Sequence, residues 1–509
     1  MKIERTRNAA RNIVFGTILK IYQLIVPFLI RTAMIYFMGV KYLGLNSLFS
    51  SLLSVLNLAE LGVGSAMVFS MYKPIAEDDS VTICALMKLY KIYYRVIGAV
   101  IAVLGIIITP FVPYLIKGDV PSDINLYALY LLNLAATVLS YWLFAYKNSI
   151  LQAHQRNDVI SKVSMITSTV QYALQLLELC LVRNYYIYII VALLIQIMTN
   201  IIIAIASDRI YPDYRAEGDL PKEKVREINK RIRDLFTAKF GTVVMTSVDT
   251  IVISVFLGLT ELAVYQNYFF VMNSVYGIIL IFFSSVLAGI GNSLIKESTD
   301  KNYTDLKKFT FIVSWLICVC CCCFLCLYQP FMELWVGKEY MLTYNYVILF
   351  GVYFYVCVLS MIWATVKDAA GLWHSDRFRM LIGACANLIM NIIMVISIGL
   401  YGVLLSTIFS YVLISMPWLL HNIFRLVYKR SAKEYLIRLG EYLAVTVFCC
   451  GLCVFLCSLI KVGLIMQLVI DLLICIIISN CIQFLLFRNS EEYKGSKEMV
   501  LKLIKNRGN

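Results

Sequence analysis

Two cationic side chains lie inside the first long apolar segment of the chain. Lys20 and Arg31 are about three helical turns apart, so a helix places them on one face. Ionisable groups at membrane depth are costly and usually face a wet cavity or a charged partner. Because a guanidinium binds two oxygens of a phosphate at once, this pair predicts a site for an anionic ligand. The alternative is that both side chains extend toward the two membrane surfaces.

Further polar side chains lie in other apolar segments of both halves of the chain. The predicted ligand-binding residues are Arg31, Lys20, Asn57, Glu60, Asp249, Gln266, Asn273 and Tyr276. Amide, carboxylate and hydroxyl groups on helix faces suit a polar cavity for a hydroxyl-rich ligand. For any single residue, the alternative is an ordinary hydrogen bond between membrane helices, worth about 0.6 kcal/mol on average.

The two acidic members of this set have two further interpretations, and both stay open. Glu60 and Asp249 can each serve as a counter-ion for Arg31 or Lys20, which would fix two helices together. Each can also titrate and couple transport to an ion, either H⁺ or Na⁺.

No catalytic residue, metal site or cofactor is predicted. Most of the sixteen cysteines lie inside apolar segments, where a thiol acts as a small apolar side chain. No CxxC pair lies beside a histidine or an exposed loop, so the spacing does not predict a metal site. His154, like the other two histidines, is expected at the membrane interface.

The elements that must position these residues are membrane-spanning helices. The chain has 509 residues, of which 61% are hydrophobic, and a soluble protein of that composition would expose large apolar patches. About fourteen segments are roughly 20 residues long, enough to cross a bilayer as helices. The predicted spans are 13–38, 47–72, 92–116, 124–146, 159–182, 186–206, 237–258, 263–289, 308–328, 344–366, 380–399, 401–424, 442–461 and 464–487.

The positive charges alternate with these segments. Most of the 45 Lys and Arg residues fall in every second gap, a bias that marks the cytoplasmic side and predicts both termini there. Membrane topology and anionic lipid headgroups therefore explain the net charge of +14, and no nucleic-acid partner is expected.

Two parts of the chain resemble each other. GVKYLGLNSLF (39–49) aligns with GLTELAVYQNY (258–268), and each follows a span that carries the triplet FGT. The predicted fold is thus an all-α integral membrane protein with two six-helix lobes, related by a parallel repeat, plus two C-terminal helices. The predicted parts are an N-lobe (1–206), a linker with an amphipathic helix (207–236), a C-lobe (237–424), and the extra spans with a cytoplasmic tail (425–509).

Several motifs, taken in order, resemble the bacterial polysaccharide transporters. The segments are LNLAELGVGSAMVFSMYKPIAEDD (56–79), SVDTIVISVFLG (247–258) and PFMELWVGKEYML (330–342). The resemblance implies a V-shaped cavity between two lobes in a bacterial inner membrane. It also implies flipping of an oligosaccharide on a polyprenyl diphosphate (an O-antigen, capsule or exopolysaccharide repeat unit) by alternating access. Arg31 matches a cationic cavity position of that family, and a polysaccharide polymerase is an expected partner.

Other classes remain as alternatives. A lipid II flippase and a multidrug exporter would share this fold. A membrane polysaccharide polymerase or glycosyltransferase would need a sizeable loop with clustered Asp, Arg or His. The short outer gaps leave no room for such a loop, so the chain is not expected to be an enzyme.

Overall fold

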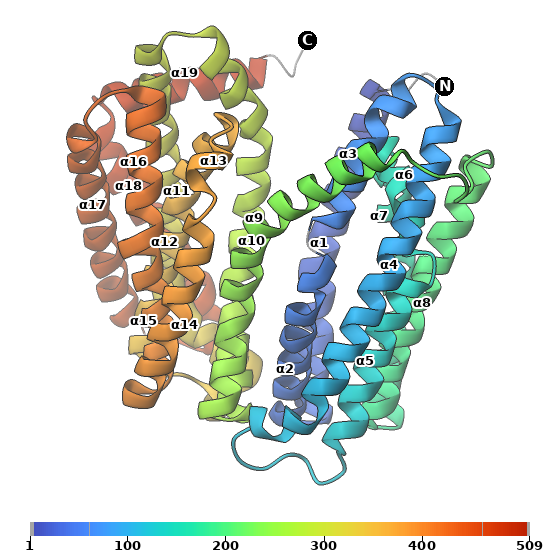
Figure 1. Ribbon diagram of the computed structural model, residues 1–509. Coiled ribbons are helices and arrows are strands. Elements are labelled where there is room, and N and C mark those ends of the chain that lie inside the picture. The colour runs from blue at the N-terminus through green and yellow to red at the C-terminus, as the bar shows by residue number, and fades with distance from the viewer. Residues whose placement is uncertain (1–4, 61, 461, 506–509) are drawn as a thin grey trace. The chain divides into compact units, whose positions relative to one another are not determined.

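The computed structural model describes residues 5–60, 62–460 and 462–505, which form helices joined by short connections (Figure 1). These residues contain no β-strand, and the predicted all-α membrane fold is confirmed. The packing divides the chain into two compact units, Met1–Ala263 and Val264–Asn509, with the boundary inside α10. The predicted division into lobes at 207–236 stays a prediction.

The first unit holds eleven short and long helical elements before α9 and ends in the first turn of α10. Its elements are α1 (Arg5–Phe37), α2 (Val40–Leu56), η1 (Asn57–Glu60), α3 (Val63–Ala76), α4 (Ser80–Ile108), η2 (Thr109–Leu115), α5 (Leu126–Trp142), η3 (Ala145–Lys147), α6 (Asn148–Ala153), α7 (Asn157–Leu181), α8 (Tyr185–Ile210) and α9 (Lys222–Phe256). Within it, α1 packs on α7, α7 on α8, α4 on α5, and α2 on α9.

The second unit is built around α11, which packs on α12, α17 and α18. Its elements are α10 (Leu259–Lys296), α11 (Thr299–Val336), η4 (Lys338–Tyr340), α12 (Tyr344–Ala369), α13 (Trp373–Asp376), α14 (Arg379–Ile398), α15 (Leu400–Ser410), η5 (Tyr411–Ser415), α16 (Met416–Ile423), η6 (Phe424–Tyr428), α17 (Lys433–Ser458), α18 (Leu464–Phe487) and α19 (Glu491–Lys505).

Among the described residues, ten helices are long and apolar enough to cross a membrane, and eleven if the bent pair of α5 with η3–α6 counts as one span. The other three predicted spans correspond to α2–α3, α7 and α9. The α2 helix and the apolar end of α9 are short, and α7 has the length of a span but carries many polar residues.

The predicted span 47–72 is a broken helix. The α2 helix ends at Leu56, the single turn η1 follows, and α3 begins at Val63. Gly62 has φ +89°, a backbone conformation that favours glycine, and a Cβ there would lie 2.8 Å from the Leu235 side chain. This break moves Asn57 and Glu60 off a regular helix face and into a turn.

The amphipathic segment predicted in the linker is not a separate helix. It forms the first part of α9, which continues without interruption into the predicted seventh span. Asn229 accepts a 2.6 Å hydrogen bond from Tyr93 of α4, and the Arg231 guanidinium lies 4.3 Å from the centre of the Phe69 ring of α3. This part of α9 therefore packs against the helices of the first unit.

The two segments that match in sequence share a local backbone conformation. Gly39 precedes α2 with φ +102°, and Gly258 precedes α10 with φ +99°. Positive φ is readily available only to glycine, so this shared turn explains why both copies start with that residue.

Candidate functional site

A cavity of about 730 Å³ lies within the first unit. It is lined by α2, η1, α3, α4, α6 and α9, and most of its side chains carry hydroxyl or amide groups. The lining residues are Ser50, Ser51, Ser54, Asn57, Glu60, Gly62, Gly64, Ser65, Tyr90, Tyr94, Asn148, Ser149, Gln152, Val243 and Ser247. Such a surface offers hydrogen-bond donors and acceptors to a hydroxyl-rich ligand.

Glu60 is held in this cavity by tyrosines. Tyr94 donates a 2.6 Å hydrogen bond to Oε1, and Tyr141 donates a 2.7 Å bond to Oε2. Tyr90 extends the chain by donating a 2.7 Å bond to the Tyr94 hydroxyl. Within the described part of the chain Glu60 forms no ion pair, so the structure does not use it as a counter-ion for Arg31 or Lys20.

Two residues that line the cavity each have an amide oxygen without a hydrogen-bond partner among the described residues. Oδ1 of Asn57 and Oδ1 of Asn148 are buried and have no hydrogen-bond partner among the residues that the structure describes. A buried acceptor without a donor costs about 1–3 kcal/mol. A ligand hydroxyl that donates to either oxygen would recover this free energy.

The two cations of the first span lie outside this cavity. The lining residues described above include none from α1, which packs mainly on α7 and also on α2. Arg31 is partly buried, and its guanidinium lies within electrostatic range of the Tyr188 hydroxyl on α8. Lys20 is exposed. Asp249 is buried on α9, and Ser247 of the same helix lines the cavity.

The remaining predicted residues belong to the second unit. Gln266 and Tyr276 are partly buried on α10, and Asn273 is exposed. Of the predicted site residues, the structure therefore gathers Asn57 and Glu60 in the cavity.

The sequence analysis did not predict that Tyr90, Tyr94 and the residues of α6 line the cavity. Tyr90 and Tyr94 lie one turn apart on α4, and this i, i+4 spacing was the available signal. Asn148 and Gln152 fell in a predicted inner gap. A bend of 48° between α5 and the η3–α6 segment, with Phe144 at φ +61°, brings α6 to the cavity. Nothing in the local sequence predicts that angle.

Comparison with solved structures identifies the fold. The chain is similar to the lipid II flippase MurJ in an inward closed conformation, with a TM-score of 0.68 and 15% identity over 94% of this chain and 99% of that one. A transporter of the MOP superfamily from Pyrococcus furiosus has a TM-score of 0.52 and 14% identity, over 82% of this chain and 96% of that one. A MATE family multidrug resistance transporter of the same superfamily, in an outward-facing conformation, has a TM-score of 0.51 and 13% identity. The match covers 83% of this chain and 96% of that one.

At these identities the likeness shows the fold alone, an all-α membrane fold that this chain shares with these solved structures. Neither a protein-family model nor a curated protein sequence matches the chain.

Proposed function

We propose that this chain is a flippase that moves a polyprenyl-diphosphate-linked oligosaccharide from the inner to the outer leaflet of a bacterial inner membrane. The observation that carries the proposal is the cavity of the first unit, with its serines, amides and unpartnered acceptors. The transporter fold supports a transport role for that cavity.

The cavity has the size and chemistry for sugars. Its volume of about 730 Å³ is within the usual range for ligand sites, about 300–1,000 Å³. Sugar hydroxyls both donate and accept hydrogen bonds, and Asn57 and Asn148 each hold an acceptor that a sugar would satisfy. A lipophilic cation would instead require a largely apolar and aromatic lining, which favours a glycan over the multidrug-exporter alternative.

The anionic diphosphate would be bound by Arg31, with Lys20 as a second cation on the same helix. A guanidinium in a partly buried position binds phosphate oxygens strongly, since water screens the charges less there. Rocking of two six-helix lobes would then expose the ligand to each side in turn, driven by H⁺, Na⁺ or the ligand itself. A polysaccharide polymerase is the partner that would receive the flipped unit.

A second candidate substrate is lipid II, because the similarity to the MurJ flippase covers 99% of that chain. Lipid II also joins sugars to a polyprenyl diphosphate, so the cavity and Arg31 would serve both ligands in the same way.

The test is flipping in proteoliposomes of a fluorescent undecaprenyl-diphosphate oligosaccharide, with fluorescent lipid II in parallel. We expect the double variant Asn57→Ala/Asn148→Ala to lose at least tenfold in flipping rate. The control Asn133→Ala removes an amide on α5 that bonds only to its own helix, and should keep the native rate. Arg31→Ala should also lose activity, whereas Arg95→Ala, which removes an exposed arginine, should not.

If the protein flips lipid II but not the oligosaccharide lipid, then lipid II is its substrate. Transport of neither lipid by the folded native protein, under an imposed proton or sodium gradient, would overturn it.

A further inference from the structure

A pocket of about 590 Å³ lies in the second unit, where η6 is followed by α17. Its lining includes three cationic side chains, those of Arg425, Lys429 and Arg430, and no acidic residue among the described residues. Leu420 and Phe424 add apolar surface, and the remaining lining residues are His421 and Ala432. Positive charge and apolar surface therefore meet in one pocket.

Two of these cations have no anion to neutralise them. Arg430 donates a hydrogen bond to the Asp300 carboxylate of α11. Arg425 and Lys429 form no ion pair and no side-chain hydrogen bond within the described part of the chain. They lie four positions apart, about one turn, and both are exposed. An anionic group at the pocket would therefore meet two cations that the protein leaves uncompensated.

The pocket lies at the end of the second unit where segments predicted to be cytoplasmic meet. Figure 1 shows α19 at the same end as the connection between α16 and α17. Hydrogen bonds and ion pairs of side chains join four of these segments there. The pairs are Arg430 with Asp300, Glu434 with Lys307, Arg438 with Glu492, and Asn422 with Ser375. Because cationic segments mark the cytoplasmic side of a membrane protein, we expect the pocket to face the anionic lipids of that leaflet.

A strip of exposed apolar side chains leads away from the pocket along α16, η5 and α15. Phe409, Leu413 and Pro417 precede His421 at intervals of four residues, and all four are exposed. In an α-helix, residues four apart drift around the axis by about 40°. The turns η5 and η6 are π-helical, with more residues per turn, and so offset this drift. The strip therefore stays on one side of the helix and can accommodate an acyl chain.

We propose that this pocket binds the headgroup of an anionic phospholipid from the surrounding bilayer. Arg425 and Lys429 would bind the phosphate, with the guanidinium donating to two of its oxygens. The acyl chains would lie along the strip that contains Leu413. Cations at the end of a membrane helix can also simply extend into interfacial water, but that role requires neither an apolar pocket nor a strip leading from it. A free phosphate would likewise use the cations alone.

The experiment is a titration of the delipidated full-length protein in detergent with dioleoyl phosphatidylglycerol, followed by native mass spectrometry and by the unfolding temperature. We expect saturable binding of the lipid and a higher unfolding temperature when it binds. Dioleoyl phosphatidylethanolamine has the same chains without the net charge, and should bind roughly tenfold more weakly. Glycerol 3-phosphate, which has no acyl chains, should not displace the lipid at equal concentration.

The variant Arg425→Gln/Lys429→Gln should weaken phosphatidylglycerol binding by roughly tenfold or more. Both residues are exposed, so we expect the variant to fold, and its unfolding temperature without lipid checks this. The matched control Arg377→Gln/Arg488→Gln removes the same charge from exposed positions outside the pocket, and should bind as the native protein does.

Undiminished phosphatidylglycerol binding in the folded pocket variant would overturn the proposal, as would an equal loss in the control. Equal affinity for the two phospholipids would show that the pocket does not recognise the charge. Displacement by glycerol 3-phosphate would identify a site for free phosphate instead, and tighter binding of undecaprenyl diphosphate would assign the pocket to the transported lipid.

Discussion

The Tyr94 hydroxyl donates a 2.6 Å hydrogen bond to Oε1 of Glu60, inside the polar cavity of the first unit. This bond joins α4 to the single turn η1, at the break between α2 and α3. Hydrogen bonds to a charged acceptor are stronger than neutral ones, about 1.5–3 kcal/mol each. Tyr94 and Tyr141 thus stabilise the Glu60 carboxylate, which has no cationic partner among the described residues.

Tyr94→Phe should therefore destabilise the first unit by about 1–3 kcal/mol, because Glu60 loses one of its two donors. Thermal unfolding in detergent micelles measures this. Tyr114→Phe is the matched control, since Tyr114 is 78% exposed and should change nothing. An equal shift in both variants would contradict the role given to Tyr94.

A substitution of Gly44 should also destabilise the first unit. A Cβ atom at this position of α2 would overlap the carbonyl oxygen of Leu259 at the start of α10. Backbone atoms cannot move aside as a flexible side chain can, so Gly44→Ala should cost about 1–3 kcal/mol by overpacking. Gly16→Ala on α1 meets nothing within 4 Å and should be neutral or slightly stabilising. The yield of folded protein and its unfolding temperature would both report the difference.

A buried ionic network in the second unit predicts a larger effect. Asp376 accepts hydrogen bonds of 2.6 and 2.9 Å from Arg379 and lies 3.3 Å from the Lys367 ammonium. Asp376→Asn leaves the buried Arg379 without its anion, while Lys367 keeps its ion pair with Asp368. The substitution should cost about 3–5 kcal/mol. Glu77→Gln, in an exposed pair with Lys73, should cost at most about 1 kcal/mol. If the two variants unfold at the same temperature, the buried network contributes no more to stability than an exposed ion pair does.

His154 predicts a pH dependence of stability. Its ring is buried and packs against the Tyr211 ring in a tilted arrangement, with the ring centroids 4.2 Å apart. Nε2 has no hydrogen-bond partner in the described part of the chain. Burial lowers the pKa of His154 below its ordinary value of about 6.5. The unfolded chain therefore binds a proton at a higher pH than the folded chain does, so stability is full above about pH 6.5 and is lost as the pH falls.

Unfolding temperatures measured from pH 7.5 to pH 5 should fall more for the native protein than for His154→Phe. His374→Gln changes an exposed histidine and should follow the native curve. If the unfolding temperature of His154→Phe falls with pH as much as that of the native protein, groups other than His154 cause the pH dependence.

The sequence by itself determined the class of fold, because the length and apolarity of a membrane helix are properties of a single segment. The run in 464–487 predicted α18 from end to end. The glycines at 39 and 258 likewise marked a turn that only glycine adopts readily, and both turns are present.

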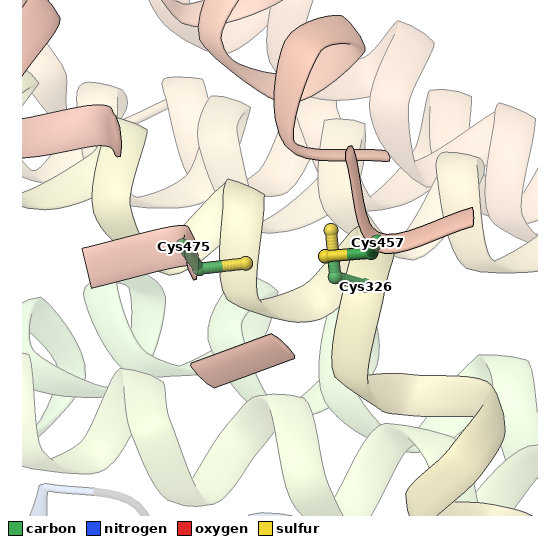
Figure 2. Close-up of side chains that lie close together, drawn as sticks. All are labelled: Cys326, Cys457 and Cys475. Carbon is green, nitrogen blue, oxygen red and sulfur yellow. The ribbon is translucent and has the colours of Figure 1, made fainter. Parts of the chain in front are cut away.

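Tertiary structure decided which polar side chains meet. Asn57 and Glu60 share a cavity because η1 interrupts the second span, and Asn148 joins them because the chain bends by 48° after α5. Three sulfur atoms lie within 4.8 Å of one another in the second unit, those of Cys326, Cys457 and Cys475 (Figure 2). Along the sequence, successive members of this group are 131 and 18 positions apart. Helix periodicity places a residue on a face, but the neighbour of that face depends on how several helices pack together, and no local pattern contains that information.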